Sequence, residues 1–146
     1  MRRAIKASID IQAPPEKVWE VLMEFPRYPE WSKYLLSIEG RAIPGLNLHV
    51  LLTDENGKLR TFNPVVLQVS PPNTFRWLEH LGVPGLLDRE HSFTLEYHFG
   101  GHTRVRQAEE YGGFLTLFLW RSFKTSTANG FAAFNHALKK RAESRR

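Results

Sequence analysis

The chain has 146 residues and contains no cysteine. The missing thiols exclude disulfide bonds, thiolate catalysis and cysteine-ligated metals, and they fit a reducing compartment. Long hydrophobic runs are missing too, because the longest strongly apolar stretch, Phe114 to Trp120, is far too short to span a bilayer. The start of the chain lacks the continuous apolar segment that a signal peptide needs. We therefore expect a cytoplasmic protein without a transmembrane segment.

The motifs of several enzyme and binding classes are also absent. No glycine-rich phosphate loop, GxSxG elbow or HExxH helix occurs in the sequence. His80, His91, His98 and His102 fall on different faces of the predicted strands, so we expect no bound metal, and no cofactor is indicated. Aromatic residues are not interleaved with basic residues in the way that stacking on nucleic acid requires. We accordingly expect no nucleic-acid partner.

The positive charge of the chain gathers at its two ends. The net charge is +5, but residues 4–138 contain thirteen basic and fourteen acidic residues, so the body of the domain is nearly neutral. We interpret the ends as a solvated basic surface, with contact to an anionic membrane or nucleic acid as the alternative. The terminal basic residues are Arg2, Arg3, Lys139, Lys140, Arg141, Arg145 and Arg146.

The first thirty residues predict a strand followed by a helix. Residues 5–11 alternate apolar and polar side chains, which is the period of a half-buried strand. Pro14 and Pro15 end that strand, and proline suits a first helical turn because its missing N–H would be unpaired there. A helix is therefore predicted to begin near Pro15 and to end at Pro26. The aromatic residues around the corner, Trp19, Phe25, Tyr28 and Trp31, are predicted to join the core.

The remaining chain predicts strands and one long helix. Asn56-Gly57 is a hairpin signal, while Pro64 indicates an edge position or a bulge within its strand. Gly130 lies inside the helix and predicts a close approach of the sheet or a ligand. One domain, residues 1–146, accounts for the whole pattern. The predicted strands are 34–40, 46–53, 59–69, 74–80, 88–99 and 103–111, and the helix runs from Leu115 to about Ala142.

The last two strands are predicted to pair through a three-residue loop. A two-residue turn at Gly100-Gly101 would set an aromatic strand face beside an arginine face. A loop formed by residues 100–102 instead pairs Phe99 with Thr103 and places His91 opposite Tyr111. We predict this second register.

Several of these motifs resemble the START-like superfamily, also called SRPBCC. The pattern I-x-I-x-A-P-P-E-K-V-W-E-V-L is followed by F-P-R-Y-P-E-W, then by Pro84-Gly85, by Glu90-His91-Ser92-Phe93 and by a terminal helix with Phe131 and Asn135. The branch that it resembles is the polyketide cyclase/dehydrase-like one. The resemblance covers nearly the whole chain and implies an α+β helix-grip fold. In that fold a curved antiparallel sheet of six or seven strands surrounds a long C-terminal helix, with two short helices near the N-terminus, and encloses an apolar cavity.

Polar residues on the predicted concave face are the candidate site. Because an unpaired buried carboxylate is costly, Glu79 and Glu109 are expected to be exposed, protonated or paired with a neighbour such as His91. His91 and Glu109 are the candidate acid–base pair, and a bulge that turns Glu79 outward is the alternative for that residue. The apolar loop from Leu81 to Leu87 is expected either to cover the core or to edge an opening. The candidate ligand-binding residues are Trp31, Trp77, Leu86, Phe93, Leu95, Tyr97, Gln107, Tyr111, Phe123 and Phe131.

Three functions are compatible with this pattern. The first is binding or transport of a small apolar, aromatic or acyl ligand by a monomer or weak homodimer. The second is a polyketide cyclase or dehydratase that uses Glu109 and His91 for proton transfer. The third, implied by the resemblance to co-chaperone relatives of the same fold, is an interaction module.

Overall fold

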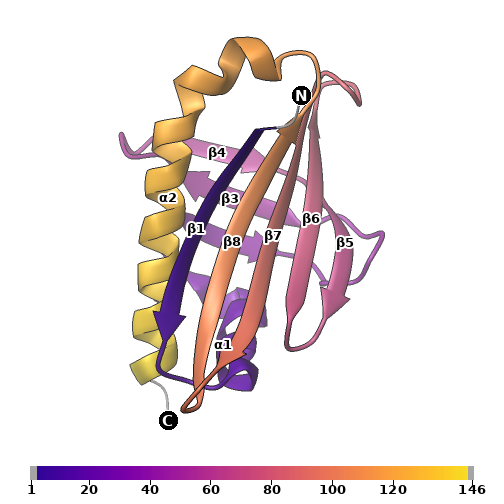
Figure 1. Ribbon diagram of the computed structural model, residues 1–146. Helices are drawn as coiled ribbons and strands as arrows, with labels where there is room; N and C mark the ends of the chain where they lie inside the picture. Colours follow the sequence, from indigo (N-terminus) through magenta and orange to yellow (C-terminus); the bar gives the residue numbers. More distant parts are fainter. Residues whose placement is uncertain (1–2, 145–146) are drawn as a thin grey trace.

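The computed structural model describes residues 3–144, so Arg2, Arg145 and Arg146 of the basic ends lie outside the described residues. It contains a long C-terminal helix, a short helix, a 3-10 helix and eight strands that pair antiparallel (Figure 1). The elements are β1 (Arg3–Ile11), α1 (Pro15–Met23), η1 (Phe25–Glu30), β2 (Leu35–Glu39), β3 (His49–Thr53), β4 (Leu59–Phe62), β5 (Val65–Ser70), β6 (Thr74–Leu81), β7 (Leu87–His98), β8 (His102–Gly112) and α2 (Thr116–Ser144).

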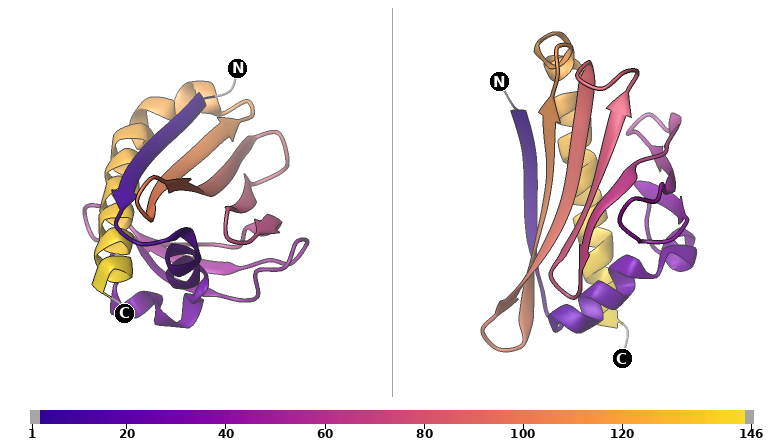
Figure 2. Two further views of the ribbon diagram at one scale, coloured as in Figure 1. Left: turned by 60° about the horizontal axis from the view of Figure 1, so that its bottom comes forward. Right: turned by 90° about the vertical axis from the view of Figure 1, so that its right-hand side faces the viewer.

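The strands form two sheets that share the core with α2. The larger sheet has the order β1-β8-β7-β6-β5, and the smaller one has the order β2-β3-β4. Figure 1 shows the smaller sheet crossing behind the larger one, and Figure 2 shows α2 running along both. α1 and η1 close one end of this arrangement (Figure 2). The predicted α+β helix-grip fold is thereby confirmed, with eight strands in two sheets.

Pro64 accounts for the additional strand. The predicted strand 59–69 is wrong as one element, because Pro64 separates β4 in the smaller sheet from β5 in the larger. Proline has no N–H to donate to a ladder, so the chain can leave one sheet there. The carbonyl oxygen of Pro64 accepts from the Leu48 N–H at 2.9 Å, and β5 forms an edge of its sheet.

The N-terminal aromatic corner packs as predicted. α1 begins at Pro15, and its buried face carries Val18 and Leu22. Tyr28 is fully buried, donates its hydroxyl hydrogen to the Leu22 carbonyl oxygen at 2.6 Å, and has its pKa raised by burial. Its ring contacts Phe25, with the ring centroids 5.9 Å apart. This corner therefore closes one end of the core and pairs the buried Tyr28 hydroxyl.

The register of β7 and β8 differs from the prediction by two residues. His98 pairs with His102, so the loop is Phe99 to Gly101 and not residues 100–102. Gly100 and Gly101 both have positive φ, at 85° and 83°, a conformation that favours glycine. The turn is therefore built on the two glycines, with Phe99 before them. This register places His91 opposite Glu109, where the prediction had placed Tyr111.

Gly130 permits a close approach to α2, but Tyr34, in the segment before β2, makes the contact where a strand of the sheet or a ligand was predicted. Phe131 and Phe134 point into the core from the same stretch of the helix. A side chain at position 130 would overlap the ring of Tyr34, which lies against the helix backbone there. The ring of Tyr34 also contacts Phe131 edge to face, with the centroids 6.3 Å apart. The segment before β2 is thus packed directly on α2.

Candidate functional site

A network of buried polar side chains crosses the core. It connects β8 with β7 and extends to α2. His91 in β7 lies between Glu109 and Gln107 of β8, with Nδ1 2.7 Å from Glu109 Oε2 and Nε2 2.9 Å from Gln107 Oε1. Tyr111 donates its hydroxyl hydrogen to the other oxygen of Glu109 at 2.5 Å. Gln107 Nε2 donates to Asn135 Oδ1 at 2.8 Å. The pairing of β7 with β8 brings His91, Glu109 and Gln107 together, and α2 supplies Asn135.

Both ring nitrogens of His91 have polar partners. Gln107 donates through Nε2 to Asn135 and places its amide oxygen beside Nε2 of His91. Glu109 places one carboxylate oxygen beside Nδ1 of His91, and its other oxygen accepts from Tyr111. The imidazole and the carboxylate therefore lie in direct contact within a buried network. In this network the Asn135 Nδ2 has no partner among the described residues.

The environment of Glu109 makes it a stable anion. Burial by itself raises the pKa of this carboxyl group. The hydrogen bond from His91, the charges of His91 and Arg89 and the hydroxyl of Tyr111 outweigh burial and lower the pKa from 4.5 to about 2. Burial and the nearby Glu109 charge raise the pKa of Tyr111, so its hydroxyl keeps the proton that it donates. Glu109 is accordingly ionised at neutral pH and is a weak base there.

Aromatic rings surround His91. Its ring stacks on Trp77 with the centroids 5.0 Å apart and meets Phe131 edge to face at 5.0 Å. Phe93 contacts it from the neighbouring position on the same strand face, at 4.7 Å. The bulk of these rings keeps water away from the contact between His91 and Glu109. The imidazole is therefore held in one orientation.

A buried ion pair stands at the edge of this cluster. Arg89 in β7 donates through Nη2 to Glu79 in β6, and each side chain is about one-tenth exposed. Glu79 is thus paired on the concave side, and the bulge considered for it is absent, because β6 and β7 pair without a register shift. Burial lowers the pKa of the Arg89 guanidinium. Its Nε hydrogen has no hydrogen-bond partner among the described residues.

A small cavity lies between the polar cluster and the smaller sheet. Its volume of about 20 Å³ is room for roughly one water molecule. The lining residues are Tyr34, Leu35, Leu52, Arg60, Phe62, Trp77, Arg89, His91, Glu109, Thr127 and Phe131.

Three of the lining side chains that are open to solvent lie in or next to the smaller sheet. Arg60 is exposed, and Phe62 and Tyr34 are partly exposed. The guanidinium groups of Arg60 and Arg89 both lie over the ring of Phe62, 5.5 and 5.7 Å from its centroid. Burial raises the pKa of Tyr34 to about 12, and the charge of Glu109 adds to that effect. An enlargement of the cavity would begin at these side chains, because each has solvent on one side.

The structure brings five of the predicted residues together around the cavity. His91, Glu109, Trp77 and Phe131 line it, and Gln107 bonds to His91 behind it. Tyr111 is buried beside Glu109, while Phe93 and Leu95 are buried deeper in the core. The roles of these residues in binding or catalysis remain predictions.

Four predicted residues lie away from the cavity. Tyr97 is 67% exposed, because the concave strand face continues beyond the end of the core. Phe123 packs on Tyr111 at 4.8 Å without lining the cavity. Leu86 lies in the connection between β6 and β7, which does not reach the cavity. Trp31 lines a separate open groove of about 550 Å³ between η1 and α2.

Arg89, Tyr34 and Asn135 were missing from the predicted site. Arg89 precedes His91 by two residues, so the alternation of side chains along a strand places both on the same face. Arg89 lies near the start of β7, where the alternation alone is a weak sign of burial. Asn135 follows Phe131 by one helical turn and shares its buried face. No comparable sequence signal marks Tyr34, whose position depends on contact with Gly130 far along the chain.

Comparisons with known proteins agree with this architecture. A family model described as polyketide cyclase/dehydrase and lipid transport matches residues 2–143. Among curated proteins, none matches the sequence.

Three solved structures illustrate the likeness in fold. The di-domain ARO/CYC BexL of the BE-7585A biosynthetic pathway is 16% identical, with 99% of this chain and 51% of that chain covered and a TM-score of 0.79. The Zhui aromatase/cyclase from Streptomyces sp. R1128 is 14% identical, with 98% and 94% covered and a TM-score of 0.79. Protein MLL2253 from Mesorhizobium loti is 24% identical, with 94% and 95% covered and a TM-score of 0.71. The chain spans about half of the BexL chain.

Proposed function

The chain belongs to the polyketide cyclase/dehydrase and lipid transport family, in agreement with the resemblance in its motifs, and we propose that it binds a small apolar or aromatic ligand that carries a carbonyl or carboxylate oxygen. The ligand would occupy the space between the two sheets and α2. The observation that carries this proposal is the buried Nε hydrogen of Arg89, a residue that lines the cavity. That hydrogen lacks a partner among the described residues. An unpaired buried donor is costly, and an acceptor oxygen from a ligand would satisfy it.

The lining residues offer contacts to both the apolar body and the oxygen atom of the proposed ligand. Trp77, Phe131 and Leu52 offer apolar contact to the body of the ligand. Arg60 and Arg89 both line the cavity, and the guanidinium group of each lies within 6 Å of the Phe62 ring centroid, at 5.5 and 5.7 Å. Guanidinium groups bind carboxylates and carbonyl oxygens through directed N–H bonds. This arrangement favours an oxygen-bearing ligand over a plain hydrocarbon.

Binding requires the cavity to enlarge, because about 20 Å³ holds no organic ligand. Displacement of the Tyr34 side chain would open space beside α2, since this ring covers Gly130 and touches Phe131. The neighbouring Arg60 is exposed and free to follow it. In the proposed binding event the ligand takes the place of the Tyr34 ring, and the core on the far side of His91 stays intact.

The test is native mass spectrometry of the protein purified from its own organism, followed by solvent extraction of any bound compound. Thr127 lines the cavity, so Thr127→Phe should fill it and abolish co-purification. Thr125 is exposed on the same helix, and Thr125→Phe is the matched control that should retain the compound. Equal retention by the two variants, or an extract without a compound from the wild type, would contradict the proposal.

Acid–base catalysis is a second candidate, favoured by the 2.7 Å contact between His91 and Glu109 beside the cavity. In this structure both ring nitrogens and both carboxylate oxygens are already bonded within the protein. A reacting ligand would have to displace Gln107 or Tyr111 to reach a proton-transfer atom. Binding is therefore the better supported of the two functions.

Proton exchange into a simple carbon acid tests the catalytic candidate. Acetophenone in deuterated water serves as the probe, and NMR measures exchange at its methyl group. Catalysis predicts exchange that Glu109→Gln abolishes while Glu110→Gln, the adjacent exposed position, leaves it unchanged. Exchange at the same rate with and without wild-type protein would leave ligand binding as the sole proposal.

A further inference from the structure

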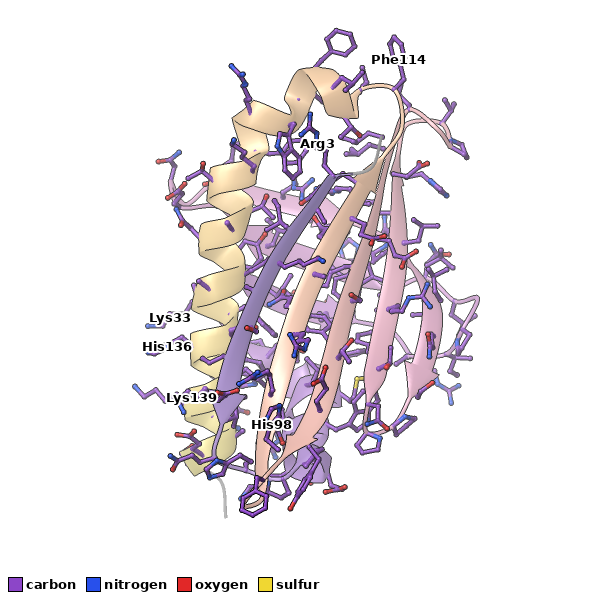
Figure 3. All side chains as sticks on the ribbon, viewed as in Figure 1. Arg3, Lys33, His98, Phe114, His136 and Lys139 are labelled. Atoms are coloured by element: carbon purple, nitrogen blue, oxygen red, sulfur yellow. The ribbon has the colours of Figure 1, made fainter. Side chains whose placement is uncertain are left out.

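An exposed apolar surface lies at the end of the molecule where β8 passes into α2. We call it the apical patch and define it as Leu81, Val83, Phe114, Leu117 and Phe118. Val83, Phe114, Leu117 and Phe118 are 66–68% exposed, and Leu81 is 38% exposed. Figure 3 shows Phe114 at this end of the molecule, with His98 near the other end. Large apolar side chains that gather on a surface mark a site of interaction.

Backbone contacts hold the apical patch together. The N–H of Phe114 donates to the carbonyl oxygen of Gly85 at 3.0 Å, and the next N–H in the chain donates to Leu86 at 2.8 Å. Gly113 permits this approach, because a side chain there would meet the Leu86 carbonyl oxygen at 2.7 Å. The rings of Phe114 and Phe118 are 5.6 Å apart. The loop between β6 and β7 and the start of α2 therefore present one apolar surface.

Positive charge follows directly behind the apical patch. Arg121 and Lys124 are exposed within two helical turns of Leu117, and the guanidinium of Arg3 lies 5.8 Å from the centroid of the Trp120 ring. Residues 111–142 contain no aspartate or glutamate, and neither does the loop 81–87. Asp88, which follows the loop, has its carboxylate bonded to the Gly85 N–H and to His80. An apolar end followed by exposed cations matches the layering of a membrane surface, where acyl chains lie beneath anionic headgroups.

We propose that the apical patch docks the protein on membranes that contain anionic lipids. Leu117 and Phe118 would enter the boundary between headgroups and acyl chains, while Arg121 and Lys124 contact lipid phosphates. Within residues 3–144, no helix is long and apolar enough to cross a bilayer, so the protein lies on the membrane.

A second copy of the chain fits the apical patch less well. Its five side chains expose on the order of 500 Å², if aromatic residues contribute 150–250 Å² each when whole. A stable protein interface buries about 800 Å² on each partner. The loop and the helix start that carry the patch project at one end of the molecule (Figure 1). A deformable lipid surface accommodates such a shape, whereas a copy of the same surface does not complement it.

The test is co-sedimentation of the purified full chain with vesicles. We expect binding to phosphatidylcholine vesicles with about 30% phosphatidylglycerol and much weaker binding to phosphatidylcholine alone. The double substitution Leu117→Ser with Phe118→Ser should lower the partition coefficient roughly tenfold or more. Replacing Arg121 or Lys124 by glutamine should lower it roughly fivefold each, and only on the anionic vesicles.

Phe99→Ser is the matched control. Phe99 is 97% exposed in the β7–β8 loop at the opposite end, so its replacement should leave vesicle binding unchanged. Val83→Ser, in a loop, provides a second test if the helix variant fails to fold by circular dichroism. Equal loss from Phe99→Ser, or wild-type protein that ignores anionic vesicles, would overturn the proposal. So would a dimer that the patch variants dissociate in sedimentation velocity. The proposal is independent of the cavity, because Thr127→Phe should keep vesicle binding while it loses the ligand.

Discussion

Replacement of Glu109 by glutamine distinguishes the contribution of its charge to stability from the contribution of its packing. The substitution keeps the size of the side chain and removes its charge. It leaves His91 with a ring nitrogen facing a neutral amide, and it removes the anion that accepts from Tyr111. Because Glu109 is about 12% exposed, water compensates little of this loss.

The size of the effect follows from the pKa of Glu109. A carboxyl group whose pKa falls from 4.5 unfolded to about 2 folded contributes about 3 kcal/mol of stability, at about 1.36 kcal/mol per pKa unit. The folded-state pKa is the lower one, so this contribution is fully present above pH 4.5. It is lost progressively as the pH falls from 4.5 toward 2.

Urea unfolding of the wild type and Glu109→Gln from about pH 7 to about pH 3 measures this contribution. At pH 7 the variant should be about 3 kcal/mol less stable, and the difference should shrink steadily below pH 4.5. Exposed carboxylates with lowered pKa, such as Glu96 and Glu143, affect both proteins equally and cancel in the difference. Glu110→Gln, at the neighbouring exposed position of β8, is the control, and at pH 7 its stability difference should be smaller than that of Glu109→Gln.

Two results would refute this reasoning. A stability difference that stays constant down to pH 3 would mean that Glu109 acts through packing and not through its charge. A variant as stable as the wild type at pH 7 would mean that the ion pair with His91 gains no more from Coulomb attraction than it loses through desolvation.

Three further substitutions test the packing around the site by denaturant unfolding. Alanine is favoured over glycine in a helix by about 1 kcal/mol, yet Gly130→Ala should destabilise the protein, because the new side chain overlaps Tyr34. In a double-mutant cycle, Tyr34→Ala should relieve this clash. Thr103→Val should cost about 1–3 kcal/mol, because the buried hydroxyl donates to the Ala13 carbonyl oxygen at 2.6 Å and valine leaves that oxygen unpaired. Phe134→Ala should cost about 3–5 kcal/mol, because its ring is fully buried. Stability within about 0.5 kcal/mol of the wild type would contradict each expectation.

Much of the fold could be predicted from the sequence because its signals are local. Alternating residues marked β1, proline marked the start of α1, and the spacing of apolar residues marked α2. Pro64 indicates a disruption of the strand that contains it, but it does not indicate that the chain passes from one sheet to the other there. A proline shows that a ladder is interrupted, while the destination of the following strand depends on the partners that the whole chain offers.

The size of the cavity could not be predicted, because it depends on contacts between distant segments. The concave face of β7 and β8 carries the expected aromatic and polar side chains, a pattern typical of a ligand site. The space beside it is nevertheless almost filled, in part by Tyr34, which reaches the helix only because position 130 lacks a side chain. Such a contact joins residues on separate elements, and neither residue reveals it alone.

The β7–β8 register shows what burial patterns leave undecided. Moving the loop by one residue shifts the pairing by two, and a shift of two keeps every side chain on its face. The predicted register and the observed one therefore bury the same residues. They differ in polar pairing: the predicted register sets Glu109 opposite Phe93, whereas the observed register sets it opposite His91. A buried carboxylate without a partner costs several kcal/mol, so the ion pair favours the observed register, and the same pairing that settles the fold of this hairpin creates the polar wall of the cavity.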